Sequence, residues 1–328
     1  MSYQVSFLHA PTFEESWERF KSGQSCPRTD VAVFLMLFAI VGLMLPSAHL
    51  DLDSYEISPK RLHARFYRMA FEVIDGGHDP LSRPDGSYMR VIVDALAMMY
   101  TVFAGLHDLA WQQVGRTARR AEGIHLFDES HRAWLQLSDI KKEYRRRLAY
   151  SIVIVDRWQC WHFMRSWAII PSFFNVSPPL FDSDDTYDPV TGARDENAPV
   201  PPPDVRLARL DFGDFLVQAF LHLRSLPSIP PEERYANART LDALLERNLI
   251  SSLNVFGATI DDVIHSRIEE TKESHRKFAQ AIVWYSSSFH IRCTIMRPFL
   301  EDEGAPADLR FASLLHARRI IVSVTVLG

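Results

Sequence analysis

Cysteine is scarce in this chain of 328 residues. Its three cysteines, Cys26, Cys160 and Cys293, lie far apart, and no C-x-x-C pair occurs. This spacing excludes a disulfide framework and a cysteine zinc site within the chain. We therefore expect a reducing compartment, the cytosol or the nucleus.

The sequence also lacks a long hydrophobic run. The most apolar stretch, residues 31–45, is followed by Pro46 and is shorter than the roughly 20 residues that a bilayer span needs. We expect it to form a helix buried on all sides of a large domain. Residues 1–10 lack the basic and apolar regions of a secretory signal, so we expect no membrane partner.

Common enzyme signatures are absent as well. The chain has 13 glycines, and none of them forms a phosphate-binding loop or a nucleophile elbow. No H-E-x-x-H motif occurs, and no two histidines are four residues apart. The sequence thus predicts no catalytic residue, no metal ligand and no cofactor.

Positive charge does not dominate the chain. The formal net charge is −5, and lysine accounts for only a few of the 36 Lys and Arg residues. A DNA-binding surface needs a basic face, which this balance does not favour. Arginine is therefore the default partner for carboxylates and phosphates.

What the sequence does contain is helical periodicity along most of its length, with almost no strand pattern. Gly123 is placed to end a helix as a left-handed cap, and Ser138 to begin the next. Prolines and acidic residues fill 171–203, which we expect to be a loop. The pattern predicts an all-α fold, a single large domain (1–328) of two helical halves, 1–170 and 204–328, joined by this Pro-rich acidic loop.

Four segments follow one another in the order of a known family. Residues 7–13 read FLHAPTF, and residues 115–125 read GRTARRAEGIH. Residues 145–157 read RRRLAYSIVIVDR, and residues 296–300 read MRPFL. Together they resemble the fungal-specific transcription factor domain, the middle homology region of regulators that bind DNA through a zinc binuclear cluster.

The resemblance implies an all-α regulatory domain that responds to metabolites or partner proteins in the nucleus. Residues 165–167 read RSW where the family has GRP, so the family's turn is not carried over here. Three cysteines cannot form the family's six-cysteine cluster. We therefore expect DNA contact only through a zinc-cluster part outside this chain, or its loss, in which case we expect the cytoplasm.

The charged motif residues have a structural interpretation. Arginine forks at the start of an apolar helix can reach carboxylates of neighbouring helices through paired hydrogen bonds. The alternative, contact with phosphate or nucleic acid, is less consistent with the net charge. We interpret five residues as structural: His9, Arg145, Arg146, Asp156 and Arg157.

An aromatic cluster follows the third motif. Such a cluster can line a small-molecule cavity between helices, although at helical spacing it is also typical of hydrophobic core. Its occupant would be a small apolar metabolite or a helix of a regulatory protein. The candidate ligand-binding residues are Trp158, Trp161, His162, Trp167, His290 and Arg297.

An enzymatic alternative rests on two acidic patterns, D-D-x-x-D and a later segment that resembles the second metal motif of class I terpene cyclases. Carboxylates at such spacing could hold Mg²⁺ ions that bind a diphosphate. The first pattern lies among prolines, however, and the second suits a helix start, so a solvated loop and a helix cap are the other interpretation. The residues are Asp184, Asp185, Asp188, Asp262 and Glu269.

The sequence thus favours an effector-sensing or protein-interaction domain of a fungal transcriptional regulator. The Mg²⁺-dependent cyclase is the first alternative. A dimerisation scaffold that binds no ligand is the second, and it predicts a homodimer without a drug-sized cavity.

Overall fold

The computed structural model describes residues 6–44, 59–76, 87–199, 205–255, 259 and 272–327. Regular structure in these ranges is helical, and the only β-structure described is two isolated bridges, Asp128 with Asn175 and Tyr187 with Arg194. This confirms the predicted all-α fold.

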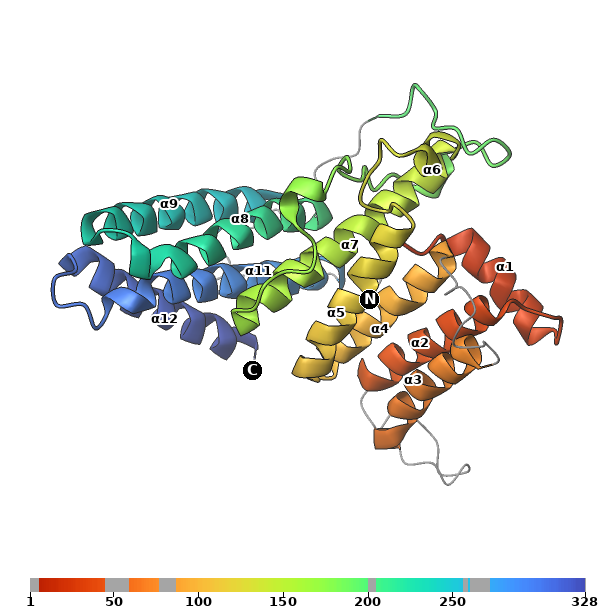
Figure 1. Cartoon of the computed structure of the whole chain (residues 1–328), viewed down its shortest axis with the longest axis horizontal. Helices are drawn as coiled ribbons and strands as arrows, with labels where there is room; N and C mark the ends of the chain where they lie inside the picture. Colours follow the sequence, from red (N-terminus) through yellow and green to blue (C-terminus); the bar gives the residue numbers. More distant parts are fainter. Residues whose placement is uncertain are drawn as a thin grey trace. The chain divides into compact units, whose positions relative to one another are not determined.

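The chain divides into two compact units, Met1–Pro201 and Pro202–Gly328 (Figure 1). The division falls at the end of the proline-rich stretch. That both units pack as one body stays a prediction.

The first unit is a layered helical body. Within it α2 packs against α3 and α4, and α5 packs against α4 and α7 (Figure 1). Its helices are α1 (Ala10–Lys21), α2 (Arg28–Met44), α3 (Pro59–Asp75), α4 (Tyr88–Phe103), α5 (His107–Gly123), α6 (Arg132–Leu135) and α7 (Asp139–Phe163).

The central helix of this unit is α4. Every residue from Arg90 to Thr101 is buried, although two of them are charged. The Asp94 carboxylate pairs with Arg120 of α5, and its other oxygen lies 3.7 Å from Arg90 Nε. Burial raises the pKa of Asp94, against the opposing effect of these arginines. The ion cluster thus joins α4 to α5 within the core.

The prediction that residues 31–45 are buried on all sides was wrong. In α2, Ala32, Met36 and Ala39 are fully buried, but Phe38 is 38% exposed and Met44 is 45% exposed. The apolar run therefore has one face in the core and one at the surface, which aromatic side chains of α1 and α3 partly cover. None of the described helices is long and apolar enough to cross a membrane.

The predicted cap at Gly123 was also wrong. Gly123 is the last residue of α5, and the left-handed conformation falls two residues later, at His125, with φ of 55°. The His125 ring stacks on His131, and its carbonyl accepts a hydrogen bond from Trp134 Nε1 at 2.7 Å. These contacts hold a non-glycine residue in a conformation that is otherwise unfavourable. Ser138 precedes α7, as predicted.

The second unit is built from four described helices. In it α11 packs against α8, α9 and α12, and Leu245, Tyr285 and Phe289 are among its buried side chains. Its helices are α8 (Val205–Ser225), α9 (Pro231–Val255), α11 (Lys272–Met296) and α12 (Ala307–Leu327).

A buried ion cluster joins three of these helices. Arg292 of α11 donates to both carboxylate oxygens of Asp242 in α9, over 2.6 and 2.8 Å. His316 Nε2 of α12 lies 3.1 Å from Asp242 Oδ1. Burial alone would raise the pKa of Asp242, but hydrogen bonds from His316 and Arg292 outweigh it and hold this pKa at about 2.

This depressed pKa predicts an acid-dependent loss of stability. The ordinary pKa of an aspartate is 3.8, so ionised Asp242 stabilises the fold above that pH, and the contribution is lost as the pH falls toward about 2. We expect the free energy of unfolding to fall between about pH 5 and pH 3 by about 1 kcal/mol more in the wild type than in Asp242→Asn. Urea unfolding followed by circular dichroism measures this difference.

Glu233→Gln, at an exposed position near the start of α9, is the control and should keep the wild-type pH dependence. An equal pH dependence in the wild type and Asp242→Asn would contradict the assignment.

Candidate functional site

Three arginines at the start of α7 make contacts within the first unit, where Arg147 is buried and Arg145 and Arg146 are half-buried. Arg145 donates from Nη2 to the carbonyl of Ile124 over 3.1 Å and lies over the ring of Trp134 at 5.2 Å. Ile124 belongs to the GRTARRAEGIH segment. Two of the sequence motifs therefore meet here, through a charged hydrogen bond to the turn after α5.

Arg146 makes a two-pronged ion pair. Its Nε lies 3.1 Å from Glu129 Oε1, and its Nη2 also pairs with that oxygen. Glu129 in turn accepts the backbone N–H of Ser177 at 2.8 Å. Burial alone would raise the pKa of Glu129, but these hydrogen bonds outweigh it and lower the pKa. Arg146 thus ties α7 to the start of the proline-rich loop.

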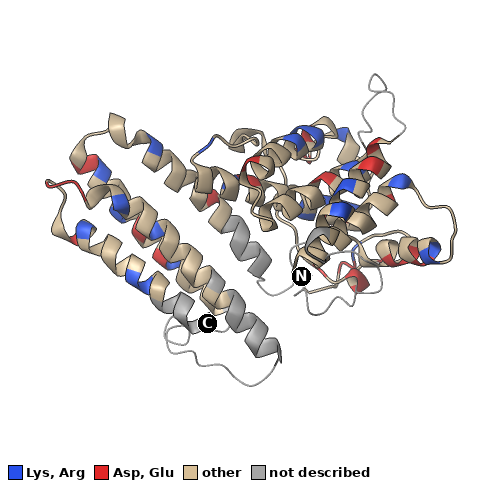
Figure 2. Ribbon diagram, turned by 90° about the horizontal axis from the view of Figure 1, so that it is seen from below, with Lys and Arg blue, Asp and Glu red and all other residues tan. Residues whose placement is uncertain are grey.

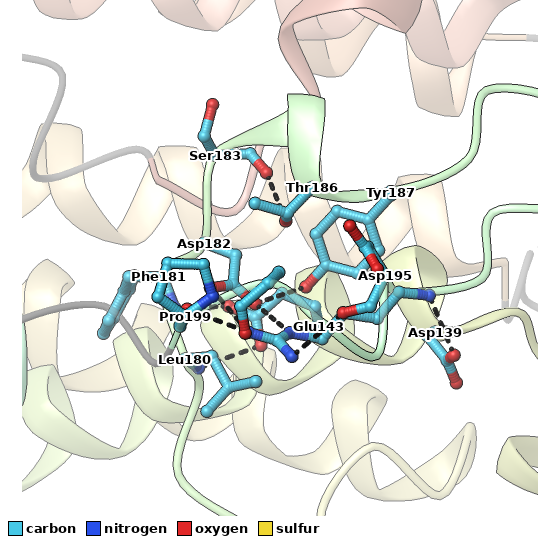
Figure 3. A network of polar contacts seen from close by, with 12 residues as sticks. Asp139, Glu143, Leu180, Phe181, Asp182, Ser183, Thr186, Tyr187, Asp195 and Pro199 are labelled. Atoms are coloured by element: carbon cyan, nitrogen blue, oxygen red, sulfur yellow. Dashed lines mark hydrogen bonds and ion pairs between the residues drawn. The ribbon is translucent and has the colours of Figure 1, made fainter.

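Arg147 and Glu143 hold the next part of this loop (Figure 3). Arg147 Nε donates to Glu143 Oε1 over 2.7 Å, and Arg147 Nη2 donates to the carbonyl of Asp182 over 2.8 Å. The Glu143 carboxylate also accepts the backbone N–H groups of Leu180 and Phe181, at 3.0 and 2.8 Å. Each buried charge therefore has several partners, as a buried ion pair requires.

Asp182 extends the same network, with only 4% of its surface exposed. Arg194 Nε donates to Asp182 Oδ2 over 2.6 Å, and the Tyr187 hydroxyl lies 3.4 Å from the same oxygen (Figure 3). Asp182 is thus buried within the acidic loop because Arg194 and Tyr187 of the same loop supply partners for its carboxylate. The solvated-loop interpretation concerned Asp184, Asp185 and Asp188, of which Asp185 and Asp188 are exposed and Asp184 is half-buried.

Asp156 fixes the turn after α7. Its carboxylate accepts the backbone N–H groups of Ala168 and Ile169 at 3.0 Å. Burial raises the pKa of Asp156, and these hydrogen bonds act in the opposite direction. Within this turn Arg165 pairs with Asp108 at 2.8 Å. This is the turn that departs from the family pattern. Arg157, the next residue of α7, is half-buried.

The first unit contains a cavity of about 550 Å³ between α1, α2, α4 and the start of α7. Most of its lining is apolar, and small-molecule sites have volumes in this range. The apolar lining residues are Phe7, Leu8, Phe13, Val33, Phe34, Met89, Ile92, Leu137 and Ile140.

Polar groups occupy part of the same wall. The cations are Arg19, Lys141 and Arg145, and Asp30 is the carboxylate beside them. His9 also lines the cavity, with Nδ1 2.7 Å from the Thr12 hydroxyl and Nε2 3.9 Å from Asp184 Oδ2. The cavity is therefore an apolar chamber with a cationic border.

A second hollow, of about 330 Å³, lies where the loop meets α7. Its charged residues are paired: Arg146 with Glu129, Lys142 with Asp139, and Arg194 with Asp182, which does not line the hollow. It therefore offers a ligand fewer unpaired groups than the larger cavity.

None of the predicted ligand-binding residues lines either cavity. Trp161 is buried, Trp158 and Trp167 are half-buried, and His162 is exposed and forms an edge-to-face contact with Trp158. The aromatic cluster therefore lies at the other end of α7 from the cavity. Its role in ligand binding stays a prediction.

The remaining two candidates belong to the second unit. His290 lies on α11 and Arg297 in the 3₁₀ turn that follows it, and both are exposed. Their ligand-binding role also stays a prediction.

Two aspartates of the first acidic pattern of the cyclase alternative accept hydrogen bonds from protein groups. Asp184 Oδ1 accepts the Tyr144 hydroxyl at 2.7 Å, and Asp188 Oδ1 accepts two backbone N–H groups of its own turn, Val190 and Thr191. Asp185 is exposed. Among the residues described, no three His, Cys, Asp or Glu side chains are placed to hold a metal ion. Asp262 and Glu269 lie outside the described residues.

Sequence reasoning had identified only part of the cavity wall. His9 and Arg145 were recognised as motif residues, but Tyr88, Lys141 and Phe34 were not singled out. Tyr88 follows a serine that caps α4, and this cap predicts a helix start rather than a cavity wall. No local signal reveals that four separate helices leave a space between them.

Comparison with known proteins finds one family. A model of the fungal-specific transcription factor domain matches residues 2–245. No curated protein matches the chain. No solved structure matches it either.

The network around Glu143 makes a prediction about the loop. In Glu143→Gln the amide cannot replace the carboxylate toward both Arg147 and the two backbone N–H groups, so a buried charge loses its partner. We expect a loss of about 3 kcal/mol in the free energy of unfolding. We also expect faster hydrogen exchange at Leu180 and Phe181, measured by mass spectrometry.

Glu196→Gln, at an exposed position in the same loop, is the matched control. Unchanged exchange in Glu143→Gln would mean that the loop is held by other contacts.

Proposed function

Because the chain belongs to the family of fungal-specific transcription factor domains, and so has a regulatory role in a fungal transcription factor, we propose that it senses a small apolar effector in the cavity of its first unit. The regulatory role follows from the family. That the domain senses an effector, and that the effector binds in this cavity, is the proposal.

The cavity is the observation that supports it. A chamber of about 550 Å³ with a mostly apolar wall suits a metabolite of drug size, because burial of apolar surface provides the binding free energy. A scaffold that binds no ligand would need no such chamber.

The composition of the wall links this chamber to the family motifs. Phe7, Leu8, His9 and Phe13 come from the FLHAPTF segment, and Arg145 begins the third motif. The family resemblance and the cavity thus concern the same residues.

Arg146 and Arg147, which follow Arg145, suggest how ligand binding in the cavity could affect the proline-rich loop. Helix α7 contributes Arg145 to the cavity and uses Arg146 and Arg147 to hold the proline-rich loop. A ligand that favours one position of this helix would also favour one arrangement of the loop. Such control requires different affinities for the two states. We propose that a regulatory protein or a second copy of the chain binds the loop and distinguishes its two arrangements.

The described part of the chain does not favour direct DNA contact. Basic and acidic residues are interspersed along the helices (Figure 2), and the guanidinium groups of Arg146, Arg147 and Arg194 are engaged by carboxylates. Phosphate contact needs cations that face solvent. We propose that this part acts in the nucleus and leaves DNA binding to another part of the regulator.

A neutral apolar probe tests the cavity directly. We expect N-phenylnaphthylamine, whose fluorescence rises in apolar surroundings, to bind the full chain at one site. In Val33→Phe the added ring fills part of the chamber, so we expect binding at least about tenfold weaker, a difference of about 1.4 kcal/mol. Fluorescence titration measures both affinities.

The control is Val41→Phe, the same substitution on the same helix at a position that does not line the cavity. It should bind the probe as the wild type does. Circular dichroism spectra must show that both variants are folded. Equal binding by the wild type and a folded Val33→Phe would rule out this cavity as the site.

A further inference from the structure

Three residues that line the cavity carry a hydrogen-bond donor that has no acceptor among the described residues. Tyr88 Oη, Arg145 Nε and Arg19 Nε are buried, and each lacks a hydrogen-bond partner in the described part of the chain. All three atoms carry hydrogen. A buried donor without an acceptor costs free energy, so a ligand that supplies acceptors gains by satisfying them.

The phenol of Tyr88 remains a donor at neutral pH. Burial raises its pKa well above the ordinary value of a tyrosine, and Arg145 offsets this only in part. The guanidinium group of Arg145 lies over the Tyr88 ring, 5.5 Å from its centre. Two charge-compatible donors, Tyr88 from α4 and Arg145 from α7, are thus neighbours in one wall.

The charge around these donors favours an anion. Arg19, Lys141 and Arg145 line the cavity beside the carboxylate of Asp30. Asp184, which lies near His9 but does not line the cavity, accepts the Tyr144 hydroxyl. An acceptor group of the ligand is therefore expected at Tyr88 and Arg145.

Apolar side chains make up most of the rest of the wall. Phe13 and Phe34 meet edge to face at 5.3 Å, and Met89 and Ile92 line the cavity from α4. Such a surface can bury a hydrocarbon or aromatic body but cannot satisfy further polar groups.

From this arrangement we propose that the occupant is a small amphipathic acid, with its carboxylate at Tyr88 and Arg145 and its apolar body among Phe13, Phe34, Met89 and Ile92. This assignment rests on the proposed function and adds the chemical class of the effector. It accounts for two neighbouring unpaired donors, Tyr88 and Arg145, beside a mostly apolar wall.

Displacement of N-phenylnaphthylamine by a matched pair of ligands tests the assignment. Dodecanoic acid and dodecanol have the same chain length, and only the acid carries a carboxylate. At neutral pH, below the critical micelle concentration, we expect the acid to displace the probe at least about tenfold more effectively than the alcohol.

Tyr88→Phe is the decisive variant. Because the Tyr88 hydroxyl has no protein partner among the described residues, its removal should leave the melting temperature almost unchanged. We expect the affinity for dodecanoic acid to fall about tenfold and that for dodecanol to stay within about twofold. A purely structural role for Tyr88 would change both affinities alike.

A second pair of variants tests the charge. Lys141→Met should weaken binding of the acid more than that of the alcohol, whereas Lys142→Met, one residue on and outside this cavity, should change neither.

Equal displacement by acid and alcohol in the wild type, or an unchanged preference for the acid in Tyr88→Phe, would overturn the assignment. Failure of the neutral probe to bind would instead overturn the proposed function, so the two failures are distinguishable.

Discussion

The first unit depends on buried and half-buried arginine side chains along one helix. Arg145, Arg146 and Arg147 follow one another at the start of α7, and each reaches a different partner: the turn after α5, Glu129 and Glu143. A buried guanidinium group is tolerable only when its hydrogen bonds are met, so these partners must stay in place. The turn after α5 and the proline-rich loop are therefore held at fixed positions around α7.

This constraint also shapes the cavity. Arg145 donates from Nη2 to the carbonyl of Ile124, while its Nε atom has no partner among the described residues and the side chain lines a chamber that α1, α2 and α4 do not fill. The same residue thus stabilises the fold and provides a charge for a ligand. A ligand bound there would contact α7, the helix that holds the proline-rich loop. The arginines of α7 would then serve both ligand sensing and the stability of the fold.

Hydropathy alone does not identify the most buried helix of the first unit. The apolar stretch in α2 was expected to be fully buried because of its hydropathy, yet the helix buried on all sides is α4, which carries Arg90 and Asp94. Asp182, in the acidic loop, is buried as well. Ion pairs, of Asp94 with Arg120 and of Asp182 with Arg194, allow these charged residues to enter the interior, and local composition does not reveal them.

The sequence by itself determined the all-α class, most helix positions and the family, because helical periodicity and short motifs are local properties of the chain. It also recognised the charged residues of the third motif. Only the tertiary structure decided which carboxylate or carbonyl each arginine meets, and that Tyr88 and Arg145 border an apolar chamber. A cavity is the space that packed helices leave unfilled, so it depends on side chains that are far apart in the sequence.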